Sequence, residues 1–197
     1  MKHYIEITLT GSPDFPLYHL WSKLYTQLHL ALVENRDASD QVNIGVSFPE
    51  YYFNEEKGMD FLGTKLRLFA EDETSLQKID IQKWFVRLND CIHITPVCRV
   101  PLNEITGYAT FSRKHIKSNA ERLARRQMKR HKDLSFHETV QRYQKNLAKS
   151  PLPFIQLESL TNSHPFKLFI EKKPAINASL KVFTTYGLSA ESTIPEF

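Results

Sequence analysis

The sequence predicts an α+β fold, with a ferredoxin-like (βαββαβ) domain in the first half and a smaller C-terminal α+β domain that contains an arginine-rich helix. Three observations predict it. Strand-like alternation and helix-like periodicity follow one another along the first half, turn residues separate these segments, and one segment of the second half concentrates positive charge. With 197 residues, 41% of them hydrophobic, the chain is long enough to bury a core.

The first half begins with a strand, because residues 3–10 alternate apolar and polar side chains. A helix is predicted from Phe15-Pro16 to about Asn35. Its apolar residues recur at helical spacing: Leu17, Leu20, Leu24, Leu28 and Ala31. A second strand over residues 42–48 ends at Pro49, which cannot donate to a ladder.

A polar loop is predicted over residues 51–63, followed by a third strand over residues 65–70. A second helix runs from residue 74 to about residue 89, and β-branched residues predict a fourth strand over residues 91–100. The domain boundary is placed near residues 101–107. This gives an N-terminal ferredoxin-like domain of residues 1–104 and a C-terminal domain of residues 105–197.

The second half is predicted to contain a strand over residues 107–116, a basic helix at about 118–131 and another helix around 135–147. Short strands are expected at 153–161, 166–171 and 180–186.

Composition limits the class of protein. No apolar run approaches the roughly 20 residues of a membrane-spanning helix, and the N-terminus lacks the layout of a signal peptide, so a soluble cytoplasmic protein is expected. Cys91 and Cys98 are expected to be small buried residues in a reducing compartment rather than a disulfide.

Positive charge is concentrated in residues 113–132, where nine lysines and arginines against one acid give a net charge of +8. The remainder of the chain carries a net charge of −4. An acidic body with one basic element is typical of a protein that binds a polyanion at one place.

The basic helix is predicted to start at a capping box, Ser118-Asn119-Ala120-Glu121. Five cations fall within an arc of about 140° on one face; these are Arg122, Arg125, Arg126, Lys129 and Arg130. Because they repel one another unless an anion lies against them, a nucleic acid is the favoured partner. The alternatives are a solvated helix face, a membrane-surface helix and a helix-turn-helix DNA reader.

The eight histidines show no metal-ligand spacing and no phosphate-binding glycine loop occurs, so neither a metal centre nor an NTPase is indicated and no cofactor is expected. Histidine chemistry on RNA remains, because an imidazole with a pKa near ~6.5 is suited to deprotonating a ribose 2′-OH. His29 is the candidate, with simple packing beside the apolar stripe as the alternative role.

Several segments, each weak alone, occur together in one order: His3-Tyr4, Asp14-Phe15-Pro16, Leu28-His29, residues 44–49, Lys117-Ser118-Asn119, residues 121–123, 125–131, 166–170 and 186–189. With them, essentially the whole chain resembles the type I-F CRISPR-associated endoribonucleases that process repeat RNA. The resemblance implies that His29 is catalytic, that Ser159 positions the attacking 2′-OH and that Tyr186 orients the histidine.

The resemblance also implies that the arginine-rich helix enters the major groove of a repeat RNA hairpin, that Arg113 reads a guanine edge and that Phe166 stacks on the terminal base pair. The residues expected to bind RNA are Arg113, His115, Lys117, Arg122, Arg125, Arg126, Lys129, Arg130, Thr161 and Phe166. His115 stands where the family has a glutamine, and Lys129 replaces an arginine and loses its planar fork.

The implied activity is metal-independent cleavage of CRISPR precursor RNA at the 3′ base of the repeat stem-loop. Attack by the 2′-OH leaves a 2′,3′-cyclic phosphate and a 5′-OH, and the mature guide RNA stays bound. The alternative is a non-cleaving structural subunit that binds the same hairpin. In either case the other subunits of a type I-F surveillance complex are expected partners.

Overall fold

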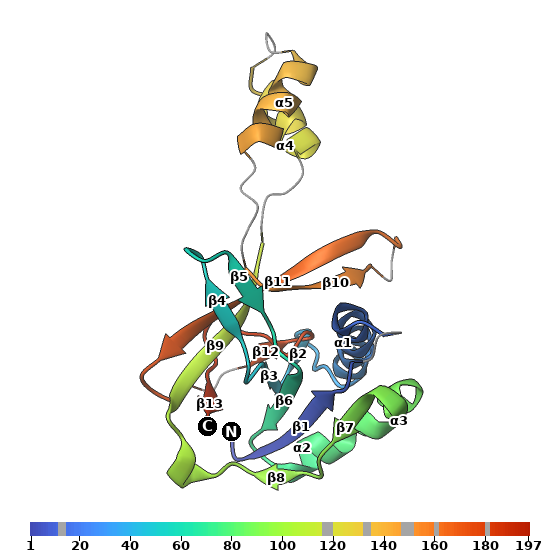
Figure 1. Cartoon of the computed structure of the whole chain (residues 1–197), viewed down its shortest axis with the longest axis vertical. Coiled ribbons are helices and arrows are strands. Elements are labelled where there is room, and N and C mark those ends of the chain that lie inside the picture. Colours follow the sequence, from blue (N-terminus) through green and yellow to red (C-terminus); the bar gives the residue numbers. More distant parts are fainter. Residues whose placement is uncertain (12–14, 116–119, 132–134, 147–151, 160–161, 180–181) are drawn as a thin grey trace. The chain divides into compact units, whose positions relative to one another are not determined.

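The structure is a computed structural model that describes residues 1–11, 15–115, 120–131, 135–146, 152–159, 162–179 and 182–197. It is a mixed α+β fold with several antiparallel sheets (Figure 1). The chain forms two compact units, residues 1–114 with 152–197, and residues 115–151. The division at residues 104 and 105 stays a prediction.

The first sheet has the strand order β3-β6-β1-β7, and all its pairs are antiparallel. Its strands are β1 (His3–Leu9), β3 (Gly45–Ser47), β6 (Lys65–Ala70) and β7 (Ile92–Ile94), and β8 (Cys98–Arg99) also pairs with β1. The register places Ile5 opposite Leu68 and Ile7 opposite Leu66, all of them buried. The alternation in the sequence therefore marks the two faces of this sheet, one of which packs on the core.

The helix α1 (Leu17–Glu34) begins directly after Pro16 and ends before Asn35, as predicted. Leu20, Leu24 and Leu28 are buried because residues at this spacing lie on one face of the helix. That face packs on the core, and α1 also contacts β10 and α3. The next residue after Leu28 is His29, which the helix holds at the edge of the buried face.

The predicted second helix is divided into three, so its prediction as one helix was wrong. These are α2 (Glu73–Ile79), α3 (Ile81–Phe85) and the 3-10 helix η1 (Val86–Cys91). Asp80 has φ of 46°, in the left-handed region that short polar residues tolerate, and it ends α2. Buried residues on both sides of Asp80 conceal the break in the sequence pattern.

The second sheet has the strand order β10-β11-β9-β13 and is antiparallel throughout. Its strands are β9 (Gly107–Lys114), β10 (Phe154–Glu158), β11 (Pro165–Ala175) and β13 (Ile194–Glu196). The edge strand β13 was not predicted, because it is three residues long and contains Pro195, which sheets accept mainly at an edge.

The two sheets share one core. The ring of Phe48 lies 5.5 Å from that of Trp21 and 5.7 Å from that of Phe111, with ring centroids as reference points. The hydroxyl of Tyr51 donates to the carbonyl of Ile170 on β11 at 3.0 Å. The second sheet therefore holds its site residues in a fixed place relative to α1.

Two strand predictions were too long. The strand expected over residues 42–48 is divided into β2 (Gln41–Val42), which pairs with β12 (Phe183–Thr184), and β3. Gly45 allows this change of partner, because a Cβ there would lie 2.6 Å from the ring of Phe183. The strand expected over residues 91–100 is interrupted between β7 and β8, where Pro96 cannot donate to a ladder.

The loop prediction for residues 51–63 was also wrong. These residues form a hairpin of β4 (Tyr52–Asn54) and β5 (Met59–Phe61), whose Tyr52 and Phe61 rings stack with centroids 5.3 Å apart. Cross-strand aromatic pairs stabilise a hairpin. The hairpin was missed because the segment as a whole is polar. Among the helices of the described ranges, none is long and apolar enough to cross a membrane.

The smaller unit is a pair of packed helices, α4 (Ala120–Met128) and α5 (Phe136–Asn146). Ala124 is fully buried in this pair. The helix expected at about 118–131 ends earlier, since Lys129 and Arg130 lie in a turn. The amide of Arg130 there donates to the carbonyl of Gln127 at 2.9 Å, a shorter-range bond that tightens the chain. The predicted N-cap, Ser118, lies outside the described residues.

Candidate active site

The imidazole of His29 is fixed by a backbone acceptor. Its Nδ1 atom lies 2.8 Å from the carbonyl oxygen of Thr185. Because a carbonyl only accepts, Nδ1 donates and must carry the hydrogen. In the neutral ring, Nε2 is then the basic nitrogen. The ring is thus held in the tautomer that presents a proton acceptor at Nε2.

The face of the same ring is held by Tyr186. The two ring centroids are 4.1 Å apart and the planes differ by 2°, so the rings stack in parallel. Aromatic contacts of this kind contribute roughly 0.5–1.5 kcal/mol beyond area burial. His29 is therefore restrained both at its edge, by Thr185, and on its face.

A tight turn presents both restraints. Gly187 has φ of 69°, and its amide donates to the carbonyl of Thr184 at 2.7 Å. The amide of Val46 donates to the carbonyl of Gly187 at 2.8 Å, and the hydroxyl of the buried Tyr25 donates to the carbonyl of Tyr186 at 2.8 Å. The turn is thereby tied to β3 and to α1, on which His29 also lies.

Burial lowers the pKa of His29 below its ordinary value; the hydrogen bond to Thr185 opposes this shift, and the positive charge of Arg113 adds to it. The net effect is a lowered pKa, so His29 is neutral at pH 7. A neutral imidazole with Nε2 available is the form that acts as a general base.

His29 lines a cavity with a volume of about 310 Å³, which is named the His29 cavity. Its lining includes Ser159, Phe166 and Tyr186 besides His29. The amide of Ser159 donates to the carbonyl of His164 at 2.9 Å, in the connection between β10 and β11. The predicted catalytic residues thus lie together, although they come from three distant parts of the chain.

Arg113 lies beside this cavity at the end of β9. Its guanidinium carbon is 5.3 Å from the ring centroid of Phe166 and 5.5 Å from that of Tyr186. Cation–π contact of this kind holds the planar group against aromatic faces. Arg113 therefore joins Phe166 and the His29–Tyr186 stack into one cluster of side chains.

The remaining predicted RNA-binding residues belong to the smaller unit or fall outside the description. His115, Arg125, Arg126, Lys129 and Arg130 are exposed in residues 115–151. Arg125 makes an ion pair with Glu121 at 3.3 Å.

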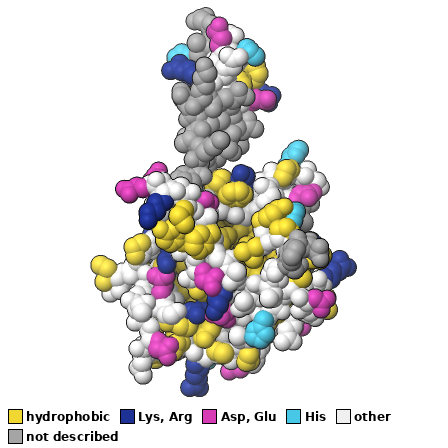
Figure 2. All heavy atoms as spheres, in the orientation of Figure 1, with side chains coloured by type: hydrophobic (Ala, Val, Ile, Leu, Met, Phe, Trp, Pro, Cys, Tyr) yellow, Lys and Arg dark blue, Asp and Glu magenta, His cyan; other side chains and the backbone are white. Residues whose placement is uncertain are grey.

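Lys117 and Thr161 lie outside the described residues, and the side chain of Arg122 is likewise not described. On the face of the larger unit that Figure 2 presents, lysines and arginines are interspersed with acidic and apolar side chains.

Sequence reasoning missed Thr185 and Tyr25. Thr185 acts through its backbone carbonyl, and such an acceptor leaves no signal in residue type. Tyr25 is a fully buried member of the apolar face of α1, where a tyrosine is indistinguishable from a packing residue. The motif of residues 186–189 did include Gly187, and this glycine was the one signal in the sequence for the left-handed φ of the turn.

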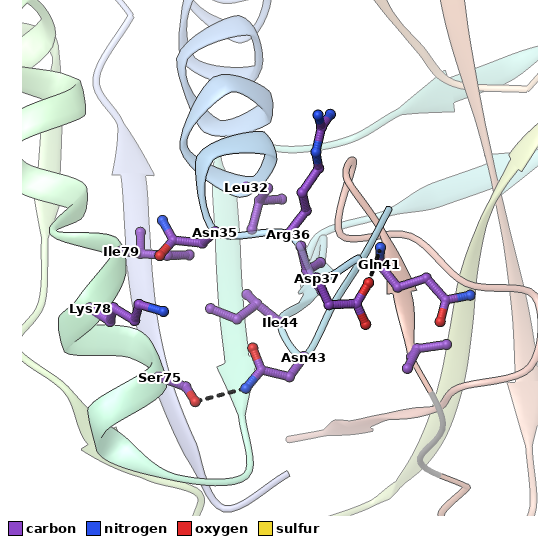
Figure 3. Close-up of a pocket in the computed structure, with 12 residues that line it drawn as sticks. Leu32, Asn35, Arg36, Asp37, Gln41, Asn43, Ile44, Ser75, Lys78 and Ile79 are labelled. Carbon is purple, nitrogen blue, oxygen red and sulfur yellow. Dashed lines mark hydrogen bonds between the residues drawn. The ribbon is translucent and has the colours of Figure 1, made fainter. Parts of the chain in front are cut away.

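Two further cavities lie in the larger unit. One, of about 420 Å³, lies at the C-terminal end of α1, where Lys78 extends toward it and Asn43 donates to the hydroxyl of Ser75 at 2.8 Å (Figure 3). Its lining, among the described residues, contains none of the predicted site residues.

The other, of about 600 Å³, adjoins the His29 cavity and is named the Trp84 groove. Its lining residues are Ser22, Lys23, Thr26, Gln27, Trp84, Arg87, Leu88, Glu158, Ser159 and Ser163.

Comparison with known proteins identifies the family. The model of the family described as CRISPR-associated protein (Cas_Csy4) matches residues 4–197. A protein of Pseudomonas aeruginosa (strain UCBPP-PA14) named CRISPR-associated endonuclease Cas6/Csy4 is 37% identical over 199 residues, covering 100% of both chains. One of the same name from Escherichia coli (strain UTI89 / UPEC) is 35% identical, again over 100% of both chains. With matches of this extent, the chain belongs to the Cas_Csy4 family of CRISPR-associated proteins.

Proposed function

We propose that this protein is an endoribonuclease that cleaves CRISPR precursor RNA at the 3′ base of the repeat stem-loop, without a metal ion, and keeps the mature guide RNA bound. The endonuclease names of two full-length relatives support the activity. The observation that carries the proposal is the restrained His29 ring, whose Nδ1 donates to Thr185 so that Nε2 is left as the base.

In the proposed reaction, Nε2 of His29 accepts the proton of the ribose 2′-OH while the hydroxyl of Ser159 positions that group. The 2′-oxygen forms a bond to the adjacent phosphorus, the bond from phosphorus to the 5′-oxygen breaks, and the 5′-oxygen takes up a proton from water. His29 then releases the proton that it accepted to solvent. The products carry a 2′,3′-cyclic phosphate and a 5′-OH. The lowered pKa of His29 supports this role, because the base must be neutral to accept the proton.

Recognition of the RNA is proposed to involve both units. Phe166 stacks on the terminal base pair of the stem and Arg113 pairs with a guanine edge, in keeping with their cation–π contact beside the His29 cavity. The arginine-rich helix, α4 with Arg122, Arg125 and Arg126, enters the major groove of the hairpin. Lys117, Lys129 and Arg130 bind phosphates, His115 contacts the RNA near Arg113, and Thr161 contacts the RNA through its hydroxyl.

The domain layout forms part of the same proposal. The order β3-β6-β1-β7, with helices between β1 and β3 and between β6 and β7, supports a ferredoxin-like N-terminal domain of residues 1–104. Residues 105–197 then supply Arg113, Ser159, Phe166 and Tyr186 as an RNA-binding C-terminal domain.

The test is to isolate the protein from cells that express its own repeat array and to determine the sequence and the 3′-end chemistry of the bound RNA. Wild type is compared with His29→Ala and with His19→Ala, which removes an exposed histidine of the same helix that does not line the His29 cavity. We expect uniform stem-loops ending in a cyclic phosphate for wild type and His19→Ala, and bound but uncleaved RNA for His29→Ala.

Two controls separate the alternatives. Cleavage in vitro should persist in EDTA and should stop when the nucleotide before the cut is 2′-deoxy, since the attacking group is then absent. Heterogeneous RNA with ordinary ends in all three proteins would refute the nuclease. Uncleaved repeat RNA bound equally by all three would instead identify a structural subunit that binds the hairpin.

A further inference from the structure

The Trp84 groove opens directly from the proposed site of cleavage. Thr26, Glu158 and Ser159 line both the groove and the His29 cavity. The remaining lining comes from α1, from α3 and η1, and from Ser163 in the connection between β10 and β11. The helix α1 contacts both α3 and β10. The two depressions are therefore adjacent, and an RNA strand that passes Ser159 can extend from one into the other.

The lining has the composition of a site for single-stranded nucleic acid. Lys23 and Arg87 are exposed cations that line the groove, and Trp84 is a half-buried aromatic residue of the same lining. Single strands are bound by cations that follow the backbone together with aromatic rings on which bases stack. Lys23 is oriented by the ring of Phe15, whose centroid lies 5.2 Å from its Nζ atom.

One lining residue opposes a phosphate. Glu158 is an exposed carboxylate where the groove meets the His29 cavity. A carboxylate only accepts hydrogen bonds, so it favours an amino or hydroxyl group beside it and disfavours a phosphate. Phosphate is therefore expected nearer Lys23 and Arg87, with a base or ribose edge toward Glu158.

The residues that line only one of the two depressions indicate which part of the RNA each depression binds. Phe166, His29 and Tyr186 line only the His29 cavity. If the stem ends on Phe166 and the attacked phosphate lies between His29 and Ser159, the strand that continues beyond Ser159 enters the Trp84 groove. We propose that the Trp84 groove binds the first single-stranded nucleotides downstream of the scissile phosphate, an inference that rests on the proposed function.

The downstream nucleotides are present in the precursor and depart with the 5′-OH fragment, so contacts in the groove act before cleavage and are lost afterwards. A groove variant should weaken binding and cleavage of RNA with a long 3′ flank. It should leave binding of the product hairpin unchanged.

The experiment uses the full-length protein and repeat hairpins with either eight nucleotides or one nucleotide after the cut. Affinity is measured by fluorescence anisotropy with RNA that is 2′-deoxy at the attacking position, and cleavage by single-turnover kinetics with ordinary RNA. Arg87→Gln is compared with Lys83→Gln, which removes an exposed cation of the neighbouring helix that does not line the groove. Trp84→Leu tests the stacking surface.

We expect Arg87→Gln to reduce the slope of log affinity against log salt by about 1 for the long-flank RNA and to leave that slope unchanged for the one-nucleotide RNA. Trp84→Leu should weaken binding of the long-flank RNA roughly tenfold. Lys83→Gln should match wild type on both.

Equal behaviour of Arg87→Gln and wild type on long-flank RNA would overturn the assignment. An equal loss on both RNAs and on the product would also overturn it, because it would place Arg87 on the hairpin or on the upstream strand. If wild type cleaves neither RNA, the proposed function fails. The anisotropy measurements still show whether the effect of Arg87→Gln on affinity depends on the length of the 3′ flank.

Discussion

Replacing Gly187 by alanine tests whether the turn that holds His29 is built as tightly as the structure indicates. A non-glycine residue at φ of 69° is strained by roughly 1–2 kcal/mol. The added Cβ would also lie 2.2 Å from Cγ2 of Val46, a buried side chain whose backbone bonds to the turn. Overpacking of this kind costs about 1–3 kcal/mol, so the total expected loss is about 2–5 kcal/mol.

Two comparisons separate strain from collision. Gly58 also has a positive φ, of 59°, but a Cβ there would meet nothing within 4 Å, so Gly58→Ala should lose only the strain, about 1–2 kcal/mol. A Val46→Ala background removes Cγ2, so the nearest remaining atom to the Cβ added by Gly187→Ala is the Cβ of residue 46, at 3.1 Å. The two substitutions should therefore couple by about 1–3 kcal/mol in a double-mutant cycle.

The assay is urea unfolding, with the midpoint and the slope both fitted so that a changed slope is recognised as a departure from two-state behaviour. Single-turnover cleavage is measured on the same proteins below the unfolding transition, where Gly187→Ala should be slower than Gly58→Ala because Thr185 and Tyr186 move with the turn. A Gly187→Ala protein within about 0.5 kcal/mol of wild type would refute the reasoning. If Gly187→Ala lowers the free energy of unfolding as much in the Val46→Ala background as in wild type, the steric clash with Val46 is refuted.

Four further predictions concern the charges and rings around the site and core. Arg113→Gln should raise the pKa of His29 in an NMR titration of the free protein, though not to its ordinary value, because burial continues to lower it; an unchanged pKa would contradict the proximity of the two groups. In wild type, single-turnover cleavage should fall as pH drops through the pKa of His29 and stay level above it; a rate that rises on acidification would contradict the base role. Tyr186→Leu should cleave roughly two- to tenfold more slowly than Tyr186→Phe, which keeps the stack, and equal rates would show that stacking does not position the base. Burial alone would raise the pKa of Glu6, but hydrogen bonds from Arg67, at 2.7 Å, and Lys65 outweigh it and lower the pKa. Its contribution to stability is therefore present above the ordinary carboxyl range and lost as pH falls below it. Glu6→Gln should cost about 1–3 kcal/mol in urea unfolding at pH 7 and flatten this acid dependence, and a neutral result would exclude a stabilising ion pair.

The local pattern of apolar residues was sufficient to predict elements that bury one face against the core. The helix α1 and the strand β6 have the predicted limits or nearly so, because their apolar residues recur at the period of the element that buries them. The pattern of apolar residues failed to predict elements whose limits depend on the backbone conformation of one residue or on a strand partner distant in sequence. Asp80 divides one apolar period into separate helices, and β2 exists because Phe183, far along the chain, pairs with Val42.

The candidate site divides in the same way. Charge counting alone located residues 113–132, and the resemblance to a family named His29, Ser159 and Tyr186, because charge and residue type are written in the chain. The tautomer of His29 was not accessible from sequence, since it depends on a backbone carbonyl 156 residues away. The lowered pKa likewise depends on burial and on Arg113, which only the packed structure brings near.

By itself, then, the sequence determined which side chains this protein has available and where the amphipathic segments lie, because periodicity and charge are local properties of the chain. Only the tertiary structure decided that α1, the Thr184–Leu188 turn and the end of β10 meet around one cavity and that the Trp84 groove continues from it. The physical reason is that tautomer, pKa and cavity shape arise from contacts between residues distant in sequence. These contacts form when the two sheets close on a common core.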